Sequence, residues 1–148
     1  MQPYPHVYLV AASGAPDGTV AVSAAGLPEI VTAAPPEFDG PGGTWSPEAL
    51  LTAAVADCFV LGFRAISRAS KFEWLALECR VEGVLERVEK SGAHFTRFKT
   101  TARLTVPPGA DEARARLLLE KAEHTCLVAN SLRGERSLEV SIVTGQAA

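Results

Sequence analysis

The chain has 148 residues, of which 47% are hydrophobic and 21% charged, and its formal net charge at pH 7 is −3. This length suits a single domain, residues 1–148, with a core large enough to fold without a disulfide framework or a structural metal. A mildly acidic chain lacks the basic surface that nucleic-acid binding requires, so we expect no nucleic-acid partner.

The first third of the chain is predicted to form three short strands. They lie at residues 7–10, 19–23 and 29–32, and turns rich in glycine and proline separate them. A glycine- and proline-rich loop follows at residues 34–45. Loops of this length in a compact domain are often functional.

A long apolar helix is predicted to begin after Ser46 and to end near residue 69. Serine is a favoured N-cap, Pro47 suits the first helical position, and Glu48 suits the positive end of the helix dipole. The helix is apolar nearly all round, so we expect it to be central and buried. We do not expect one sheet to cover so apolar a helix fully, which favours cover by a second subunit.

Two features predict a cytoplasmic protein without a membrane segment. The apolar run at residues 49–63 contains Asp57 and is shorter than the roughly 20 residues that span a bilayer. The first residues show neither the basic nor the apolar region of a signal peptide.

The second half is predicted to form a long hairpin, a helix and a final edge strand. Apolar and polar residues alternate over residues 75–82 and again over 98–106, with a turn at 89–92 between them. Asp111 is positioned to cap a second helix, and residues 138–142 alternate as the last strand. The order β-β-β-α-β-β-α-β indicates an α+β fold with antiparallel sheets.

The chain has three cysteines, and this odd number argues against a purely structural disulfide framework. Cys58 lies in the apolar helix and Cys126 near a helix boundary. If the fold brings them together they can form a redox pair, and otherwise both are small buried hydrophobes. Cys79 falls on the apolar face of a strand, where it is expected to pack. Their spacing fits no metal site, so we expect no metal and no cofactor.

Two segments of the sequence resemble the OsmC/Ohr family of osmotically inducible and organic hydroperoxide resistance proteins. One runs from Trp45 to Cys58 and contains the helix start Pro-Glu-Ala-Leu, with Cys58 ten residues after Glu48. The other is the Lys-Ala…Cys…Asn-Ser segment at residues 121–131, which contains Cys126. The long hairpin between them also fits this family.

The resemblance implies an OsmC-like fold, with antiparallel sheets around a central buried helix, in an intertwined homodimer with its active site at the interface. It implies a thiol-dependent peroxidase, an organic hydroperoxide reductase, with a dithiol of the lipoyl type as reductant. By the same resemblance Cys58 matches the peroxidatic cysteine, Cys126 the resolving cysteine, and Glu48 a glutamate that pairs with an arginine beside the reactive thiolate.

The chain departs from the family pattern at that arginine. No lysine or arginine precedes Arg64, and the two family positions fall near the turn at residues 15–18 and near Glu37. A peroxide is cleaved by a thiolate, which burial disfavours and a nearby cation stabilises. The remaining candidates for the cation are Arg64, His124, Arg133 and Arg136.

Two functions therefore stay open from the sequence. One is a peroxidase that acts through Cys58 and Cys126. The other is an OsmC-like thiol sensor or small-molecule binder with low or no peroxidase activity. Glu48 can also be explained as a residue that favours the helix dipole. Four aromatic residues can line an apolar pocket or simply pack in the core: Phe38, Trp45, Phe59 and Phe63.

Overall fold

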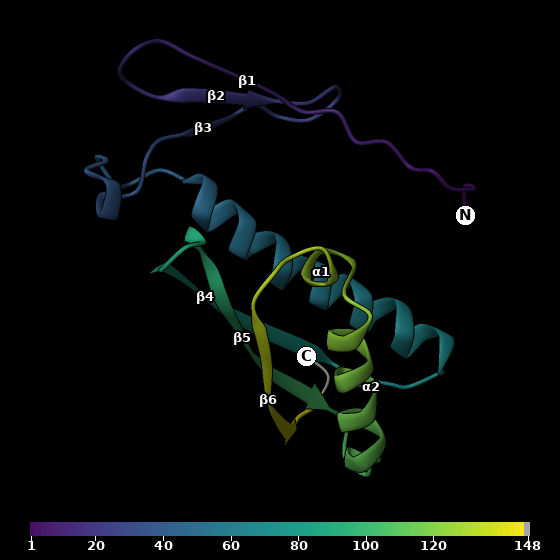
Figure 1. The fold of residues 1–148 in the computed structure, drawn as a ribbon. Helices are drawn as coiled ribbons and strands as arrows, with labels where there is room; N and C mark the ends of the chain where they lie inside the picture. Colours follow the sequence, from purple (N-terminus) through teal and green to yellow (C-terminus); the bar gives the residue numbers. More distant parts are fainter. Residues whose placement is uncertain (147–148) are drawn as a thin grey trace. The chain divides into compact units, whose positions relative to one another are not determined.

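The computed structural model describes residues 1–146, and its internal contacts divide the chain into two compact units (Figure 1). The first unit is Met1–Leu51, and the second begins at Thr52. Helix α1 (Pro47–Ala69) continues without a break from one unit into the other. The single domain over residues 1–148 stays a prediction.

The first unit contains a small antiparallel sheet with the strand order β1-β2-β3. Its strands are β1 (Ala11–Gly14), β2 (Val20–Ser23) and β3 (Ile30–Thr32). The turn between β1 and β2 includes Gly18, which has φ +91°, a conformation that glycine adopts without strain. The second and third predicted strands are confirmed.

The first strand is displaced from its predicted position at residues 7–10. The observed strand is β1, which pairs with β2 from Ala11–Ser23 to Gly14–Val20. Register explains the shift, because the ladder ends where β2 ends at Ser23 and the chain turns away after it. Residues 7–10 therefore pair with no strand in the described part of the chain.

The loop after β3 leads into α1 through a built N-cap. It contains a short 3-10 helix, η1 (Pro36–Phe38), and an isolated bridge between Thr32 and Trp45. The Ser46 side-chain oxygen accepts a hydrogen bond from the Ala49 amide at 3.1 Å, as predicted for an N-cap serine. The loop and the cap together fix where α1 begins.

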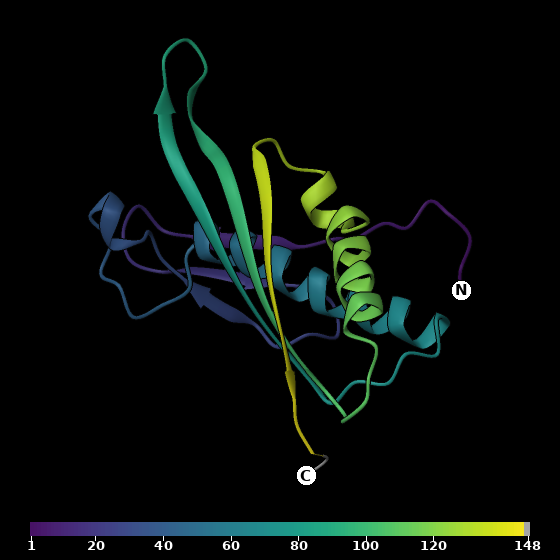
Figure 2. The same ribbon diagram turned by 90° about the horizontal axis from the view of Figure 1, so that it is seen from below.

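The second unit contains a larger sheet with the strand order β4-β5-β6. Strands β4 (Ala76–Val88) and β5 (Gly92–Val106) form a long antiparallel hairpin, and Figure 2 shows its tip extending beyond β6 (Glu135–Thr144). The hairpin has an irregularity in register between Val84 and Leu85. The hairpin and the edge position of the last strand were both predicted.

Strand β6 pairs in parallel with β5, which differs from the antiparallel sheet expected from the sequence. The chain returns between them through α2 (Glu112–His124) and the short α3 (Leu127–Asn130). This helical crossover carries the chain back to the starting end of β5, so β6 runs in the same direction. Gly134 has φ +117°, and a Cβ there would lie 2.9 Å from the Thr96 backbone, so the entry to β6 requires glycine.

The core of the second unit lies where α1 and α2 cover β5. Phe59 and Phe63 of α1 are fully buried, as are Leu104 of β5 and Leu119 of α2. The Phe63 ring also meets the Trp74 ring edge to face, with centroids 5.3 Å apart. This core holds the middle of α1 against the sheet and so fixes the position of Cys58.

Helix α1 is long and apolar enough to cross a membrane by length and composition alone. Its most apolar 18-residue window has a mean hydropathy of 1.8, and 17% of that window is buried. Phe59 and Phe63 point into the core of the second unit, which is how a core helix behaves. Four residues of α1 are buried: Val55, Phe59, Phe63 and Ser67. Leu61, in contrast, is 49% exposed in the isolated chain.

Candidate functional site

The fold brings Cys58 and Cys126 into contact. Cys58 lies in the middle of α1, and Cys126 lies between α2 and α3, at the N-cap of α3. Both thiols are free, and a side-chain hydrogen bond joins them. Two cysteines that are far apart in the sequence therefore lie beside each other, one on α1 and the other between α2 and α3.

The Cys126 thiol is buried, with 4% of its surface exposed. Burial raises the pKa of Cys126, and the neighbouring Cys58 raises it further. The backbone amides of Ala129 and Val128 face the sulfur and act on the pKa in the opposite direction. The net effect keeps Cys126 as a protonated thiol at neutral pH.

Cys79 lies on β4, where it pairs with Ala102 of β5 and packs against the core. Burial, and secondly the charge of a Cys126 thiolate, raise the pKa of Cys79 to about 11. The predicted packing position is therefore confirmed. Its electrostatic link to Cys126 places it in the neighbourhood of the pair, which the sequence did not indicate.

A narrow cleft of about 10 Å³, room for about one water molecule, opens beside Cys126. It is lined by apolar residues of α1 and β5 and by polar groups of the crossover and β6. The lining residues are Val55, Phe59, Phe98, Thr100, Glu123, Cys126, Ala129 and Arg136. The cleft thus combines a thiol, an ion pair and an apolar wall within one unit.

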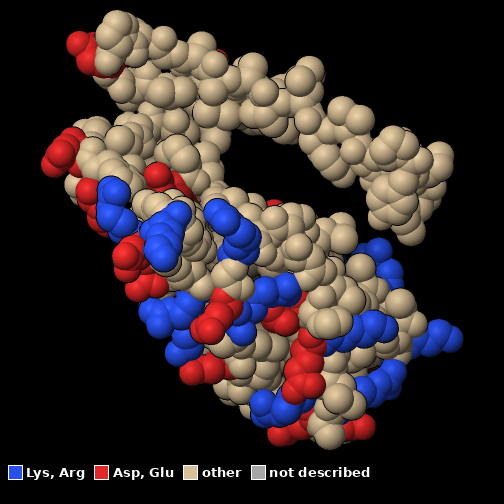
Figure 3. All heavy atoms as spheres, in the orientation of Figure 1, with Lys and Arg blue, Asp and Glu red and all other residues tan. Residues whose placement is uncertain are grey.

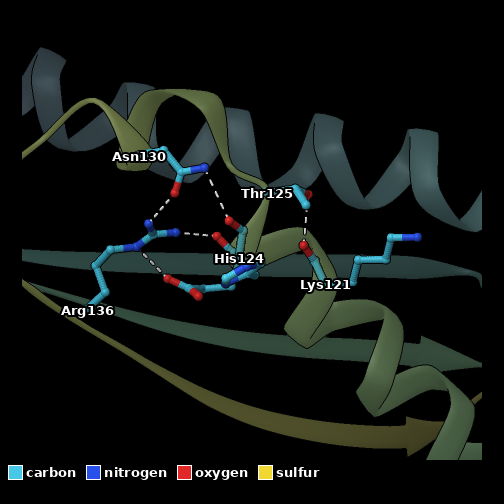
Figure 4. Close-up of polar contacts among 6 residues, drawn as sticks. Lys121, His124, Thr125, Asn130 and Arg136 are labelled. Atoms are coloured by element: carbon cyan, nitrogen blue, oxygen red, sulfur yellow. Dashed lines mark hydrogen bonds and ion pairs between the residues drawn. The ribbon is translucent and has the colours of Figure 1, made fainter.

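Arg136, near the start of β6, forms a dense set of polar contacts at this cleft (Figure 4). Its Nε donates to Glu123 Oε1 at 2.6 Å, and the same atoms form an ion pair. Its two terminal nitrogens donate to the Asn130 side-chain oxygen and to the Glu123 carbonyl. The Asn130 amide in turn donates to the His124 carbonyl at 3.2 Å.

Of the four candidate cations, only Arg136 lines the cleft that contains Cys126. The other three candidates are exposed: Arg64, His124 and Arg133. Figure 3 shows the wider distribution, with basic side chains on later segments only, because every lysine and arginine lies at or after Arg64. The chain has no arginine at the two family positions, and the candidate cation that lines the cleft, Arg136, comes from β6 instead.

Glu48 lies in the first turn of α1 and belongs to the first unit. It lines an open apolar pocket of about 550 Å³, together with residues of β2 and the loop before α1. One of its carboxylate oxygens is buried. A carboxylate at the edge of an apolar pocket fits a role in holding or orienting a polar group of an apolar ligand.

The four aromatic residues have different positions. Phe38 lines the same apolar pocket as Glu48, and Phe59 lines the cleft beside Cys126. Phe63 is a core residue, and Trp45 is 53% exposed. Among residues 1–146 no group of three or more histidine, cysteine and acidic side chains is arranged to hold a metal ion.

The sequence did not single out Glu123 or Asn130, and it offered Arg136 only as one of four cations. One signal was available. Arg136 precedes Leu138, Val140 and Ile142 in the alternating pattern of the last strand, so a charged residue shares the inward face of an otherwise apolar strand. An inward charge normally has a buried partner, which here is Glu123.

Comparisons with known proteins agree with this architecture. Residues 40–141 match the OsmC family, described as OsmC-like protein. Over 118 residues the chain is 31% identical to the uncharacterized protein YmaD of Bacillus subtilis. This alignment covers 75% of this chain and 77% of YmaD.

Solved structures extend the likeness to nearly the whole chain. An organic hydroperoxide resistance protein OsmC from Legionella pneumophila superposes with a TM-score of 0.75 and 25% identity, over 95% of this chain and 99% of that one. An OsmC-like protein of unknown function from Vibrio cholerae superposes with a TM-score of 0.84 and 15% identity, over 93% and 100%, which shows the fold alone. The α+β class and the OsmC-like fold are confirmed, and the chain belongs to the OsmC-like protein family.

Proposed function

We propose that this protein is a thiol-dependent peroxidase that reduces organic hydroperoxides through a two-cysteine cycle. The observation that carries the proposal is the hydrogen bond between the thiols of Cys58 and Cys126. A structural relative at 25% identity is an organic hydroperoxide resistance protein. Two thiols in contact, one of them buried, are the minimum that such a cycle requires.

The proposed cycle has three steps. The Cys58 thiolate attacks the outer oxygen of the hydroperoxide, which breaks the O–O bond and gives a Cys58 sulfenic acid and an alcohol. The Cys126 sulfur then attacks the Cys58 sulfur, which forms a disulfide and releases water. A dithiol reductant, with the lipoyl type as our expectation, returns both cysteines to thiols and becomes a disulfide itself.

The raised pKa of Cys126 supports this division of roles. Because its raised pKa keeps Cys126 protonated, Cys126 is the hydrogen-bond donor of the pair. Cys58 is also the more exposed of the two sulfurs, since Cys126 is buried. The peroxide therefore meets Cys58 first, and Cys126 acts second.

We further propose that the working form is a homodimer in the cytoplasm. Four of the 23 residues of this apolar helix are buried in the single chain and Leu61 is 49% exposed, so a second copy would cover apolar surface that α1 leaves open. Glu48 and Cys58 are ten residues apart on one helix, a rise of about 15 Å. For Glu48 to act beside the reactive sulfur, as in the family pattern, it must therefore serve the Cys58 of a second copy.

A thiol sensor or small-molecule binder is the second candidate. One observation favours it: the basic residue at the cleft, Arg136, is already engaged by Glu123 and Asn130. A guanidinium held in an ion pair stabilises a thiolate less than one that faces it directly. On this alternative Cys58 is oxidised stoichiometrically by peroxide but turns over slowly.

A steady-state assay separates the two candidates. We expect the protein to consume cumene hydroperoxide with dihydrolipoamide as reductant, and we expect Cys58→Ser to abolish consumption. The control is Cys79→Ser, which should retain it. After one equivalent of peroxide, mass spectrometry should find a Cys58–Cys126 disulfide in the wild type and a Cys58 sulfenic acid in Cys126→Ser. Stoichiometric oxidation without turnover would instead support the sensor, and no oxidation of Cys58 would contradict both the peroxidase and the sensor.

A further inference from the structure

We propose that Arg136 is a positioning residue that clamps the Cys126 loop and thereby sets the rate at which Cys126 closes the disulfide with Cys58. The inference rests on the proposed function for its catalytic meaning. Its physical basis is the arrangement of three hydrogen bonds around one guanidinium.

The three bonds, drawn in Figure 4, join Arg136 to residues that precede and follow Cys126 in the sequence. On one side, Arg136 binds the side chain and the carbonyl oxygen of Glu123, which lies in the last turn of α2. On the other side, it binds the side chain of Asn130, the last residue of α3. Cys126 lies between these two anchor points, so the clamp spans the segment that carries the sulfur.

This segment needs an external brace. Helix α3 has four residues, which is too short to be stable by itself in water. The Glu123 carbonyl, in the last turn of α2, accepts from the Cys126 amide at 3.3 Å and also from Arg136, so Arg136 binds a carbonyl that is itself bonded to the Cys126 backbone. The Arg136 and Glu123 side chains are 24% and 22% exposed, so loss of either one would leave a largely buried charge without its partner.

Arginine is suited to this task in a way that lysine is not. The planar guanidinium presents its N–H groups in a fixed fork, so the three acceptors of Glu123 and Asn130 are held in one arrangement. A lysine keeps the positive charge but replaces the fork with a point donor on a flexible stem. The pair Arg136→Lys and Arg136→Gln therefore separates geometry from charge.

The clamp acts on the second step of the cycle and leaves the first unchanged. Disulfide formation requires the Cys126 sulfur to approach the Cys58 sulfur in a narrow geometry, whereas peroxide attack requires only Cys58 and the peroxide. A loosened loop should therefore prolong the life of the Cys58 sulfenic acid. A second peroxide then oxidises it to the sulfinic acid, with release of a second alcohol.

The test resolves the two steps in rapid-quench mass spectrometry with cumene hydroperoxide. In Arg136→Lys we expect the loss of the Cys58 thiol to stay within about twofold of wild type, while disulfide formation slows by about tenfold or more, in line with the cost of small misplacements. The sulfinic fraction should rise in parallel. The control is Arg133→Gln, at an exposed arginine in the loop before β6, which should match wild type in both steps.

A second readout does not depend on peroxidase activity. Diamide oxidises two neighbouring thiols to a disulfide without peroxide, and we expect this reaction to slow in Arg136→Lys and, less strongly, in Asn130→Ala. Asn130 is exposed, so its variant loses one of the three bonds and keeps the ion pair. If wild-type Cys58 resists peroxide, the proposed function fails, but the diamide series still tests the clamp. Disulfide rates unchanged in both folded variants would overturn it.

Discussion

The thiols of Cys79 and Cys126 are both shifted toward their protonated forms. Burial is the larger cause for each, and a neighbouring cysteine is a further cause. In the cycle that we propose, the resolving attack needs a thiolate, so the raised pKa of Cys126 means that disulfide closure should accelerate as the pH rises above neutrality.

Cys79 should label slowly and with an unusual pH dependence. With a pKa of about 11, its iodoacetamide labelling rate should rise about tenfold for each pH unit between pH 7 and 9, without a plateau. Peptide mapping by mass spectrometry gives the rate for this cysteine alone. Because Cys126 is itself protonated at neutral pH, Cys126→Ser should leave the labelling rate of Cys79 near the wild-type value at pH 7. A plateau near pH 8.5 in the wild type would contradict the buried position.

Ser67 should contribute to stability far more than a surface serine. It is 1% exposed, and its side-chain oxygen accepts a hydrogen bond from Trp74 Nε1 at 2.8 Å. In Ser67→Ala the indole N–H loses that acceptor, so we expect the free energy of unfolding to fall by about 1–3 kcal/mol. Urea unfolding measures it. Ser141→Ala, an exposed change on β6, should stay within about 0.5 kcal/mol.

At the scale of elements, side-chain caps set where the helices begin. Ser46 caps α1, and Asp111 caps α2 with its Oδ1 accepting from the Arg114 amide at 2.9 Å. Both caps were expected from the sequence. Helix α2 ends two residues before Cys126, so the residue at which α2 begins helps to determine where Cys126 lies.

Removal of the α2 cap should destabilise the protein modestly. Asp111→Ala leaves the Arg114 amide without its acceptor, and such losses cost about 0.5–2 kcal/mol. Asp111→Asn keeps an oxygen in the same place, so we expect the free energy of unfolding to fall by only a few tenths of a kcal/mol. The midpoint of urea unfolding should therefore order as wild type, Asn variant, Ala variant. An Ala variant equal to wild type would mean that the cap does not stabilise α2 in solution.

At the scale of the whole molecule, the apolar surface that α1 leaves exposed, which includes Leu61, is the surface that a second copy would cover. It lies on the helix that carries Cys58, so the assembly state and the thiol site are linked through one element. The parallel pairing of β6 has a similar effect, because it brings Arg136 of the last strand to the loop of Cys126.

A charge placed on α1 should disrupt the proposed dimer. Leu61 is 49% exposed in the isolated chain, and Leu61→Lys would place an ammonium group in the interface that we propose. The mass of a single chain is 15.6 kDa. Light scattering at micromolar concentration should find a mass near twice this value for the wild type and near this value for the variant. Leu117→Lys, on the exposed side of α2, is the matched control and should remain a dimer. A wild type that is already a stable monomer would refute the dimer.

Much of the local structure follows from the sequence, because its signals are short-range. Turn glycines, the Ser46 and Asp111 caps and the alternating strands act within a few residues, and the structure has these elements at the expected places. The spacing of Glu48 and Cys58 and the segment around Cys126 also identified the family. These features determined the fold class and the two cysteines worth examining.

The tertiary structure decided what depends on long-range pairing. The strand expected at residues 7–10 shifted because its register depends on where β2 ends, and β6 became parallel because the helical crossover reverses the chain. The same crossover selected Arg136 over three other basic residues, since only its side chain faces the cleft of Cys126. Periodicity along one strand cannot report which segment lies opposite, because the partner is fixed by packing between residues far apart in the chain.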